Sequence, residues 1–170
     1  DPSGYNSVSS NTVTPVAVTA GATTANINFV DEQPGSISGS VLADTDNDDD
    51  GDDPIMGVTL TLKDSNGDDI DSDPIAAGVQ PTTTTTDLNG AYTFSNVAPG
   101  SYRVVETDPS GYNSVSSNTV APVAVTAGAT TANIDFVDEQ PGSISGSVLA
   151  DTDNDDDGDD PIMGVTLTLK

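Results

Sequence analysis

The stretch ADTDNDDDGDDP, at residues 43–54, concentrates side chains that can bind a metal ion. Seven carboxylates lie among the ten residues 44–53, with no lysine, arginine or histidine between them. Alternate aspartates followed by a glycine, Asp46-x-Asp48-x-Asp50-Gly51, are typical of the first half of an EF-hand calcium loop. In that loop, positions one, three and five supply oxygens and a glycine at position six allows a sharp turn. The stretch therefore predicts a calcium site.

The predicted loop supplies too few ligands by itself. If Asp46 is position one, the carbonyl of Asp52 is the ligand at position seven. Position twelve, where the EF-hand has a bidentate glutamate, is Gly57 in this sequence. Because calcium prefers about six to eight oxygens, we expect the remaining ligands to come from Asp44, Asp53 or another loop. Asp87 is the candidate from a second loop.

An acidic run is more often a solvated surface loop than a binding site. Here, however, like charges about 5–7 Å apart cost about 1 kcal/mol per close pair even near water, so they oppose a folded loop unless a cation neutralises them. Calcium suits the ligand type and spacing better than magnesium, which keeps its waters and needs fewer protein oxygens. We therefore favour a calcium loop over a merely solvated one.

A second acidic stretch follows the segment GVTLTLK. Asp64, Asn66 and Asp68 have a spacing that would serve another ion, whereas Asn66 followed by Gly67 also predicts a plain hairpin turn with a polar flank. Both interpretations stay open. Two acidic pairs near the repeat boundaries are weaker candidates for a calcium bridge between domains: Asp31 with Glu32, and Asp138 with Glu139.

The chain repeats itself with a period of 107 residues. Residues 1–63 and 108–170 align without a gap, and they differ only where Thr14 becomes Ala121 and Asn28 becomes Asp135. A period of this length suits a small domain in a tandem array rather than a solenoid repeat.

One complete domain and parts of two neighbours are therefore expected. We place the C-terminal part of the preceding repeat at 1–34, the complete calcium-binding repeat at 35–137, and the linker with the N-terminal part of the next repeat at 138–170. The second acidic loop offers the equivalent candidate ligands: Asp151, Asp153, Asp155, Asp157, Asp159 and Asp160.

Composition argues against several classes of function. The 170 residues include 28 acids against 3 bases, a net charge of −25, which repels nucleic acid and anionic lipid. No apolar run approaches the ~18 residues that a membrane span needs, so we expect none in this segment. Because the chain has neither histidine nor cysteine, and its carboxylates cluster in one loop rather than across a cleft, we expect no enzyme.

Apolar residues alternate with polar ones through most of the period, which predicts strands. The predicted strands lie around residues 37–41, 58–62, 82–86, 92–94, 102–107, 123–125 and 134–136. Asn89-Gly90 is suited to a tight hairpin, and no window has helical periodicity. Seven or eight short strands in about 100 residues predict an all-β sandwich.

Several motifs occur in the order of a known family. They are the G-x-V opening at 39–41, the acidic loop followed by GVTLTL, and the segments at 86–92, 99–102 and 109–112. The sequence resembles the B-type repeats of SD-repeat surface proteins, which belong to the wider group of Cna-B-like, prealbumin-type β-sandwiches. The resemblance implies a Greek-key sandwich and calcium-stabilised rods that hold a functional head away from a bacterial surface, in an extracellular location.

Related Cna-B domains often carry a Lys–Asn isopeptide bond promoted by a buried acid, and the resemblance gives Glu106 the position of that acid. No lysine occurs between residues 35 and 62, and Lys63 ends the following strand, so no crosslink is predicted. We expect Glu106 to pair with Arg103 or Lys63, or to accept a hydrogen bond.

Two functional classes remain. One is a structural, calcium-stabilised repeat of an extended stalk or filament, with neighbouring repeats and identical chains as partners. The other is an adhesin module that binds carbohydrate or protein. Near-identical repeats favour the first, because a binding head needs a distinctive surface in one place. With about five residues, including Pro141, between domains, we expect repeats to stack end to end.

Overall fold

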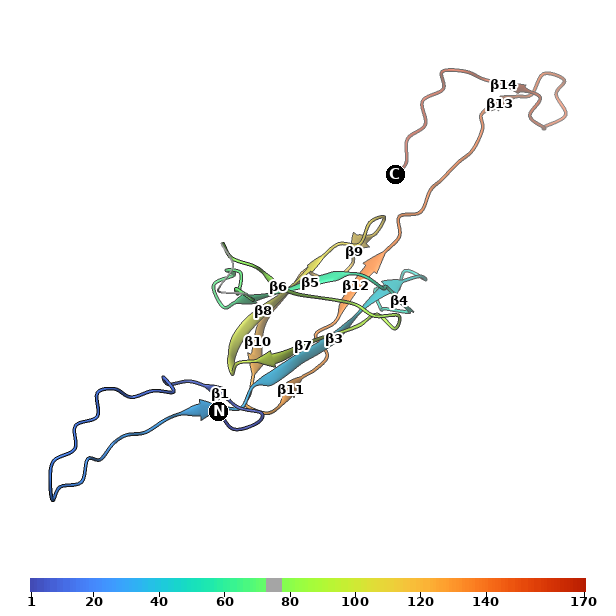
Figure 1. Cartoon of the computed structure of the whole chain (residues 1–170). Helices are drawn as coiled ribbons and strands as arrows, with labels where there is room; N and C mark the ends of the chain where they lie inside the picture. Colours follow the sequence, from blue (N-terminus) through green and yellow to red (C-terminus); the bar gives the residue numbers. More distant parts are fainter. Residues whose placement is uncertain (73–77) are drawn as a thin grey trace.

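The computed structural model describes residues 1–72 and 78–170, and these form strands without any helix (Figure 1). None of them therefore belongs to a helix with the length and hydropathy to cross a bilayer. The longer strands are β3 (Gly35–Asp44), β5 (Thr59–Asp64), β7 (Ala91–Val97), β8 (Gly100–Thr107) and β10 (Thr119–Val125). The shorter strands of the same repeat are β4 (Asp53–Pro54), β6 (Thr82–Thr85), β9 (Asn113–Ser114), β11 (Thr130–Thr131) and β12 (Phe136–Glu139).

Two sheets face each other, which confirms the predicted β-sandwich. One sheet has the order β10-β8-β5-β6 with antiparallel neighbours throughout. The other is built around β3, which pairs antiparallel with β7 and parallel with β11 and β12, while β9 extends the sheet beyond β12. The first strand of the repeat, β3, and its last strand, β12, thus lie side by side and run in the same direction.

The core forms where the alternating faces of the two sheets meet. Ile37 and Val41 of β3, Leu60 of β5, Val104 of β8 and Phe136 of β12 are each fully buried. This is the period-2 pattern that the sequence predicts, because successive side chains of a strand point to opposite faces. Burial of these side chains contributes roughly 1.5–3 kcal/mol each, which gives a chain with so large a net charge enough apolar packing to fold.

The turn at Asn89-Gly90 is not the predicted hairpin. It joins β6 to β7, and these strands belong to different sheets. Asp87 N–H donates to the Ala91 carbonyl and Gly90 has a φ of 70°, so the tight turn itself is present. The sequence pattern identified the turn correctly, but the following strand crosses to the opposite sheet instead of folding back on its predecessor.

The predicted strand through residues 134–136 is divided from β11 by an irregular segment. β11 pairs with the start of β3 and β12 with its end, and between them the chain passes over Gly39. β12 continues through Asp138 and Glu139, two residues beyond the predicted domain boundary at 137. These two acids therefore belong to the last strand rather than to a linker.

The two flanking pieces lie at opposite ends of the sandwich (Figure 1). The preceding piece contains β1 (Asn6–Ser7) paired with β2 (Asp31–Glu32), and the following piece contains β13 (Leu149–Ala150) paired with β14 (Asp160–Pro161). Only Gln33 and Pro34 separate β2 from β3, fewer than the expected five residues, because the acidic pair before them is part of a strand. The junction also contacts the sandwich, since Gly128 N–H donates to the Pro34 carbonyl at 3.3 Å.

Candidate metal centre

The acidic loop joins β3 to β4 at the end of the sandwich where β12 leaves it. Pairing of Ala43 with Asp53 closes the base of the loop, and Asp52 N–H donates to the Ala43 carbonyl at 2.8 Å. In the parallel ladder Glu139 lies opposite Asp44, so the loop stands beside the end of the last strand. The candidate centre is thus held by a strand pair on one side and faces the junction to the next repeat on the other.

Asp44 organises the loop. Its side chain is buried, and its two carboxylate oxygens accept N–H groups from Asp46 at 3.2 Å, Asn47 at 2.7 Å and Asp49 at 2.9 Å. Asn47 and Asp49 adopt φ values of 65° and 68°, a left-handed conformation that Asn and Asp tolerate better than most residues. The loop therefore winds around one carboxylate that comes from the end of β3.

Three carboxylates converge inside this loop. Asp44, Asp46 and Asp48 each offer an oxygen, and these oxygens lie within 4.8 Å of one another. The pKa of Asp46 is raised, chiefly by the neighbouring charge of Asp48, and further by Asp52 and Asp44. The loop thus gathers negative charge at a single point, which favours a cation there.

Asp52 is outside the converging group, but its negative charge helps to raise the pKa of Asp46. Its carboxylate accepts the N–H and the hydroxyl of Thr45, both at 2.8 Å, and these two hydrogen bonds lower the pKa of Asp52. Asp50 donates its N–H to the Asp48 carboxylate, but its own side chain lies outside the converging group. Asp53 lies in β4 and lines a hollow of about 300 Å³ with Asp44, Tyr112 and Gln140.

This arrangement starts the EF-hand-like register at Asp44, two residues earlier than the sequence motif suggests. Asp44, Asp46 and Asp48 then take positions one, three and five, and Asp49, with its positive φ, takes the turn position six. Gly51 has no positive φ. A Cβ at Gly51 would lie 2.5 Å from the Leu42 Cβ, so this glycine allows close packing on β3 instead of a sharp turn.

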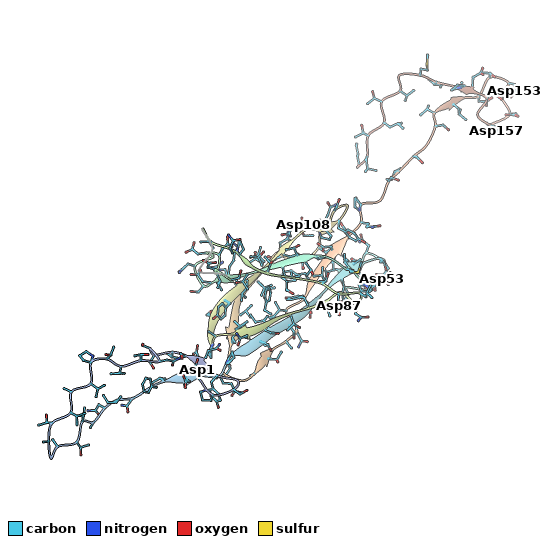
Figure 2. The ribbon with its side chains drawn as sticks, viewed as in Figure 1. Asp1, Asp53, Asp87, Asp108, Asp153 and Asp157 are labelled. Carbon is cyan, nitrogen blue, oxygen red and sulfur yellow. The ribbon has the colours of Figure 1, made fainter. Side chains whose placement is uncertain are left out.

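The second acidic loop also brings three carboxylates together, with Asp159, the equivalent of Asp52, in place of the equivalent of Asp48. Asp151, Asp153 and Asp159 offer oxygens within 4.8 Å of one another, and Asp151 accepts N–H groups from Asn154 and Asp156. The remaining predicted ligands of this loop, Asp155, Asp157 and Asp160, are outside that group. Asp153 and Asp157 are labelled in Figure 2, on the loop between β13 and β14. Because this piece lacks most of its sandwich, the loop geometry arises from the local sequence.

The other predicted ligands have different surroundings. Asp87 lies at the same end of the sandwich as Asp53 (Figure 2), but its carboxylate accepts the N–H groups of Asn89 and Ala91 and is not part of the converging group. Asp64 accepts the N–H groups of Asn66 and Asp68 and the Asn66 side-chain amide, and these hydrogen bonds lower its pKa. For Asp64, Asn66 and Asp68 this favours the hairpin interpretation over the second ion.

Glu106 has neither of the basic partners that the sequence predicts for it. Lys63 forms an ion pair with Asp69 at 2.5 Å, Arg103 donates to the Ser65 carbonyl, and both Glu106 oxygens are buried. Asp138 is equally buried, and a hydrogen bond between the two carboxyl groups contributes to the shifts of both pKa values. The alternation of the strands could have indicated that both acids are buried. Glu106 lies two residues after the buried Val104, and Asp138 lies two residues after the buried Phe136, so each acid is on the core-facing side of its strand.

Comparisons with known proteins agree with this fold. The profile of the family described as "SpaA: Prealbumin-like fold domain" matches residues 42–140, from the end of β3 to just beyond β12. The chain belongs to this family. The match confirms the predicted resemblance to prealbumin-type β-sandwiches.

Curated relatives of this prealbumin-like domain are much longer proteins. Serine-aspartate repeat-containing protein F of Staphylococcus epidermidis is 36% identical over 148 residues, which cover 76% of this chain and 8% of that protein. Serine-aspartate repeat-containing protein D of Staphylococcus aureus is 33% identical over 131 residues, covering 68% of this chain and 9% of that protein. The chain therefore spans less than a tenth of the length of these relatives.

Solved structures share the prealbumin-like fold at low sequence identity. The minor pilin GBS52 of Streptococcus agalactiae superposes with a TM-score of 0.50 at 17% identity, over 78% of this chain and 61% of that one. This likeness supports the all-β sandwich fold.

Proposed function

We propose that this domain is a calcium-stabilised structural repeat, and that successive repeats build an extended extracellular stalk or filament. The observation that carries the proposal is the convergence of Asp44, Asp46 and Asp48 in a loop without a basic residue. Three carboxylate oxygens within 4.8 Å of one another repel each other unless a cation lies between them. The same loop recurs one period later with its own converging group.

The ligand set is that of a hard cation. Asp44, Asp46 and Asp48 supply carboxylate oxygens, the Asp50 carbonyl falls on position seven, and Asp52 falls on position nine. Water completes the shell in many calcium loops, which matches the solvent-facing side of this one. Asp53 and Asp87 stay predictions as further ligands, because they lie at this end of the sandwich but outside the converging group.

The stalk proposal is supported by the repeats and by their junction. Near-identical copies give the same surface at regular intervals, as a spacer requires. The two-residue junction at Gln33 and Pro34 is also tied to the sandwich by the Gly128 hydrogen bond, and Asn6 of the preceding piece donates to Asn96 of β7 at 3.4 Å. The natural partners of a repeat are therefore the repeats before and after it.

Thermal unfolding of the chain in calcium and in excess EGTA tests the calcium requirement. A ligand that binds only the folded state raises the stability by RT ln(1 + [L]/Kd), about 2.7 kcal/mol at a hundredfold excess over Kd. We expect a clearly higher Tm in calcium, and magnesium at the same concentration serves as the control. An unchanged Tm in EGTA would remove calcium from the proposal.

Paired variants in both acidic loops test the ordered site. Asp46→Asn with Asp153→Asn removes one converging carboxylate per loop, whereas Asp49→Asn with Asp156→Asn removes the same charge from positions outside the groups. Asn is suited to the left-handed φ at 49 and 156, so the control leaves the turn intact. The first pair should lose most of the calcium-dependent rise in Tm and the second little. Equal losses would indicate diffuse attraction of ions to an acidic surface.

A further inference from the structure

The last residues of the preceding piece lie against a glycine turn of the sandwich. Gly128, between β10 and β11, has a φ of 68°, and a Cβ added to it would lie 2.6 Å from Gln33 Oε1 and 2.8 Å from Gln33 Cδ. The side-chain amide of Gln33 therefore occupies the space that a Cβ would fill. The Gly128 N–H also donates to the carbonyl of Pro34 at 3.3 Å.

Two further contacts join the preceding piece to the same end of the sandwich. Asn6 of β1 donates its side-chain amide to the side-chain oxygen of Asn96 in β7, at 3.4 Å. Burial, and then the negative charge of Glu32 in β2, raise the pKa of Tyr102 in β8. Residues from both ends of the preceding piece thus face the sandwich at the place where β3 begins.

The equivalent residues one period later provide an internal comparison. Asn113 and Pro141 occupy the positions of Asn6 and Pro34, and only part of a repeat follows them in this chain. Asn6 and Pro34 are half-buried, whereas Asn113 and Pro141 are exposed. Asn6 is the more buried of the two asparagines although its own piece lacks most of a sandwich, and the contact with the following repeat explains the difference.

The exit end of the sandwich, where β12 leaves it, has the matching half of this contact. Gln140 occupies the position of Gln33 there. It lines the hollow of about 300 Å³ together with Tyr112 and with Asp44 and Asp53 beside the acidic loop. The glutamine that lies against a glycine turn at the first junction is thus part of the wall of a hollow at the second.

Charge gives the contact a direction. The exit end carries the acidic loop, with seven carboxylates among residues 44–53. The two segments that receive the preceding piece, 96–102 and 125–131, form the entry surface and contain no charged residue. Two exit ends would therefore repel each other, whereas an exit end can approach an entry surface without like-charge repulsion from these segments.

We propose that the exit end of each repeat is a docking surface for the glycine turn on the entry surface of the next repeat, and that Gln33 and Gln140 set the orientation of neighbours. The partner is therefore a second repeat of the same kind, joined exit end to entry surface. The inference rests on the stalk part of the proposed function and not on calcium, because a glutamine, an asparagine and main-chain groups make the contact. It adds an interface to the covalent link at every junction.

Introduced thiols can report this contact, because the chain has no cysteine. In Asn6→Cys with Asn96→Cys, a short bifunctional thiol reagent should bridge the two positions within one chain, as measured by intact mass and protease digestion. Asn113→Cys with Asn96→Cys is the matched control and should not be bridged, since Asn113 pairs with Glu139 at the exit end. Equal bridging in the two proteins, or none in the first, would overturn the proposal.

Paired variants test the orienting glutamine. Gln33→Ala should slow the bridging between positions 6 and 96 several-fold, and Gln140→Ala, the same change at the other junction, should leave it unchanged. Gly128→Ala should also slow it, because a Cβ displaces the Gln33 amide. Its control is Gly21→Ala, at the equivalent turn of the preceding piece, where φ is 74° and nothing lies within 4 Å of a Cβ. If Gly128→Ala fails to fold, the glutamine pair decides, and equal rates in that pair would overturn the role of Gln33.

A chain lengthened by the rest of the next repeat tests the exit end. There, a cysteine at 113 should be bridged to one at the next repeat's equivalent of Asn96, and Gln140→Ala should now slow the reaction. Both chains are compared in calcium and in EGTA. Absence of bridging in both conditions would overturn the docking and leave the repeats as a flexible tether, whether or not calcium stabilises them. Bridging together with a Tm that EGTA leaves unchanged would support the docking and remove only calcium from the proposed function.

Discussion

Glu106 makes the stability of the metal-free domain depend on pH. Burial, and then the facing Asp138 and Asp108, raise its pKa from 4.5 to about 8 in the folded protein. Between these two values the folded chain holds a proton that the unfolded chain has released, so the free energy of unfolding falls as the pH rises. The destabilisation is complete above about pH 8 and absent below about 4.5.

This dependence is measurable by urea unfolding in EGTA across pH 5 to pH 9. The parent should lose stability relative to Glu106→Gln as the pH rises. Most of this change in the difference between their unfolding free energies should occur between the two pKa values, 4.5 and about 8. A difference that stays constant across the range would show that Glu106 does not hold the extra proton. Tyr92 stays neutral throughout, because burial raises its pKa beyond the range.

At the scale of single residues, the acidic motif located the loop in which the carboxylates converge but not the residue that makes its turn, and calcium there stays a prediction. The glycine of the motif suggested position six at Gly51, but Asp49 adopts the positive φ and Gly51 packs against Leu42. Asx residues tolerate that conformation, so glycine alone is an incomplete guide in an aspartate-rich loop. The inward acid Asp138 escaped prediction because the strand that carries it extends into the presumed linker.

At the scale of the elements, Gly39 determines how the last part of the repeat crosses the first strand. A Cβ at this position would lie 1.8 Å from the Ile134 carbonyl oxygen and 2.5 Å from its carbon. Both are backbone atoms, and Ile134 N–H is itself bonded to the Ser38 carbonyl at 3.2 Å, so the segment cannot shift aside without losing that contact.

Gly39→Ala should therefore destabilise the domain by about 3 kcal/mol or more, at the upper end for overpacking. Gly142→Ala is the matched control, because nothing lies within 4 Å of a Cβ there and its φ is not positive. Chemical denaturation in calcium measures both. A Gly39→Ala protein as stable as the Gly142→Ala protein would contradict the packing described for this crossing.

The strands themselves were predictable because alternation reports which residues share a face. Val104 and Glu106, for example, follow the same inward pattern. Alternation does not report which neighbour a strand pairs with, and so Asn89-Gly90 suggested a hairpin where the chain changes sheets. Likewise, the irregular crossing before β12 depends on the distant Gly39, a contact that no local pattern contains.

At the scale of the whole molecule, the junction between repeats favours an extended array. Gln33 and Pro34 alone separate β2 from β3, and the fixed φ of proline together with the Gly128 contact restricts bending. Strands of seven to ten residues at ~3.3 Å per residue, with their end loops, give each repeat a length of about 35–45 Å.

Small-angle scattering of a three-repeat chain in calcium tests this shape. We expect a maximum dimension close to three repeat lengths, roughly 105–135 Å on the same strand geometry. Removal of calcium should broaden the distribution of lengths, because the acidic loop stands beside the junction. A maximum dimension near that of one compact globule, with calcium present, would exclude the extended stalk.

The parallel pairing of β3 with β12 has a mechanical consequence. The chain enters the repeat at the start of β3 and leaves it at the end of β12, and residues 41–44 pair with 136–139 in the same direction. Tension along a tether of such repeats would drag the two strands past each other lengthwise. The bonds between them would then be strained all at once in shear, rather than opened one by one as in a peeled hairpin. The resistance of the tether to pulling would thus reside in the contact between the first and last strands of every repeat.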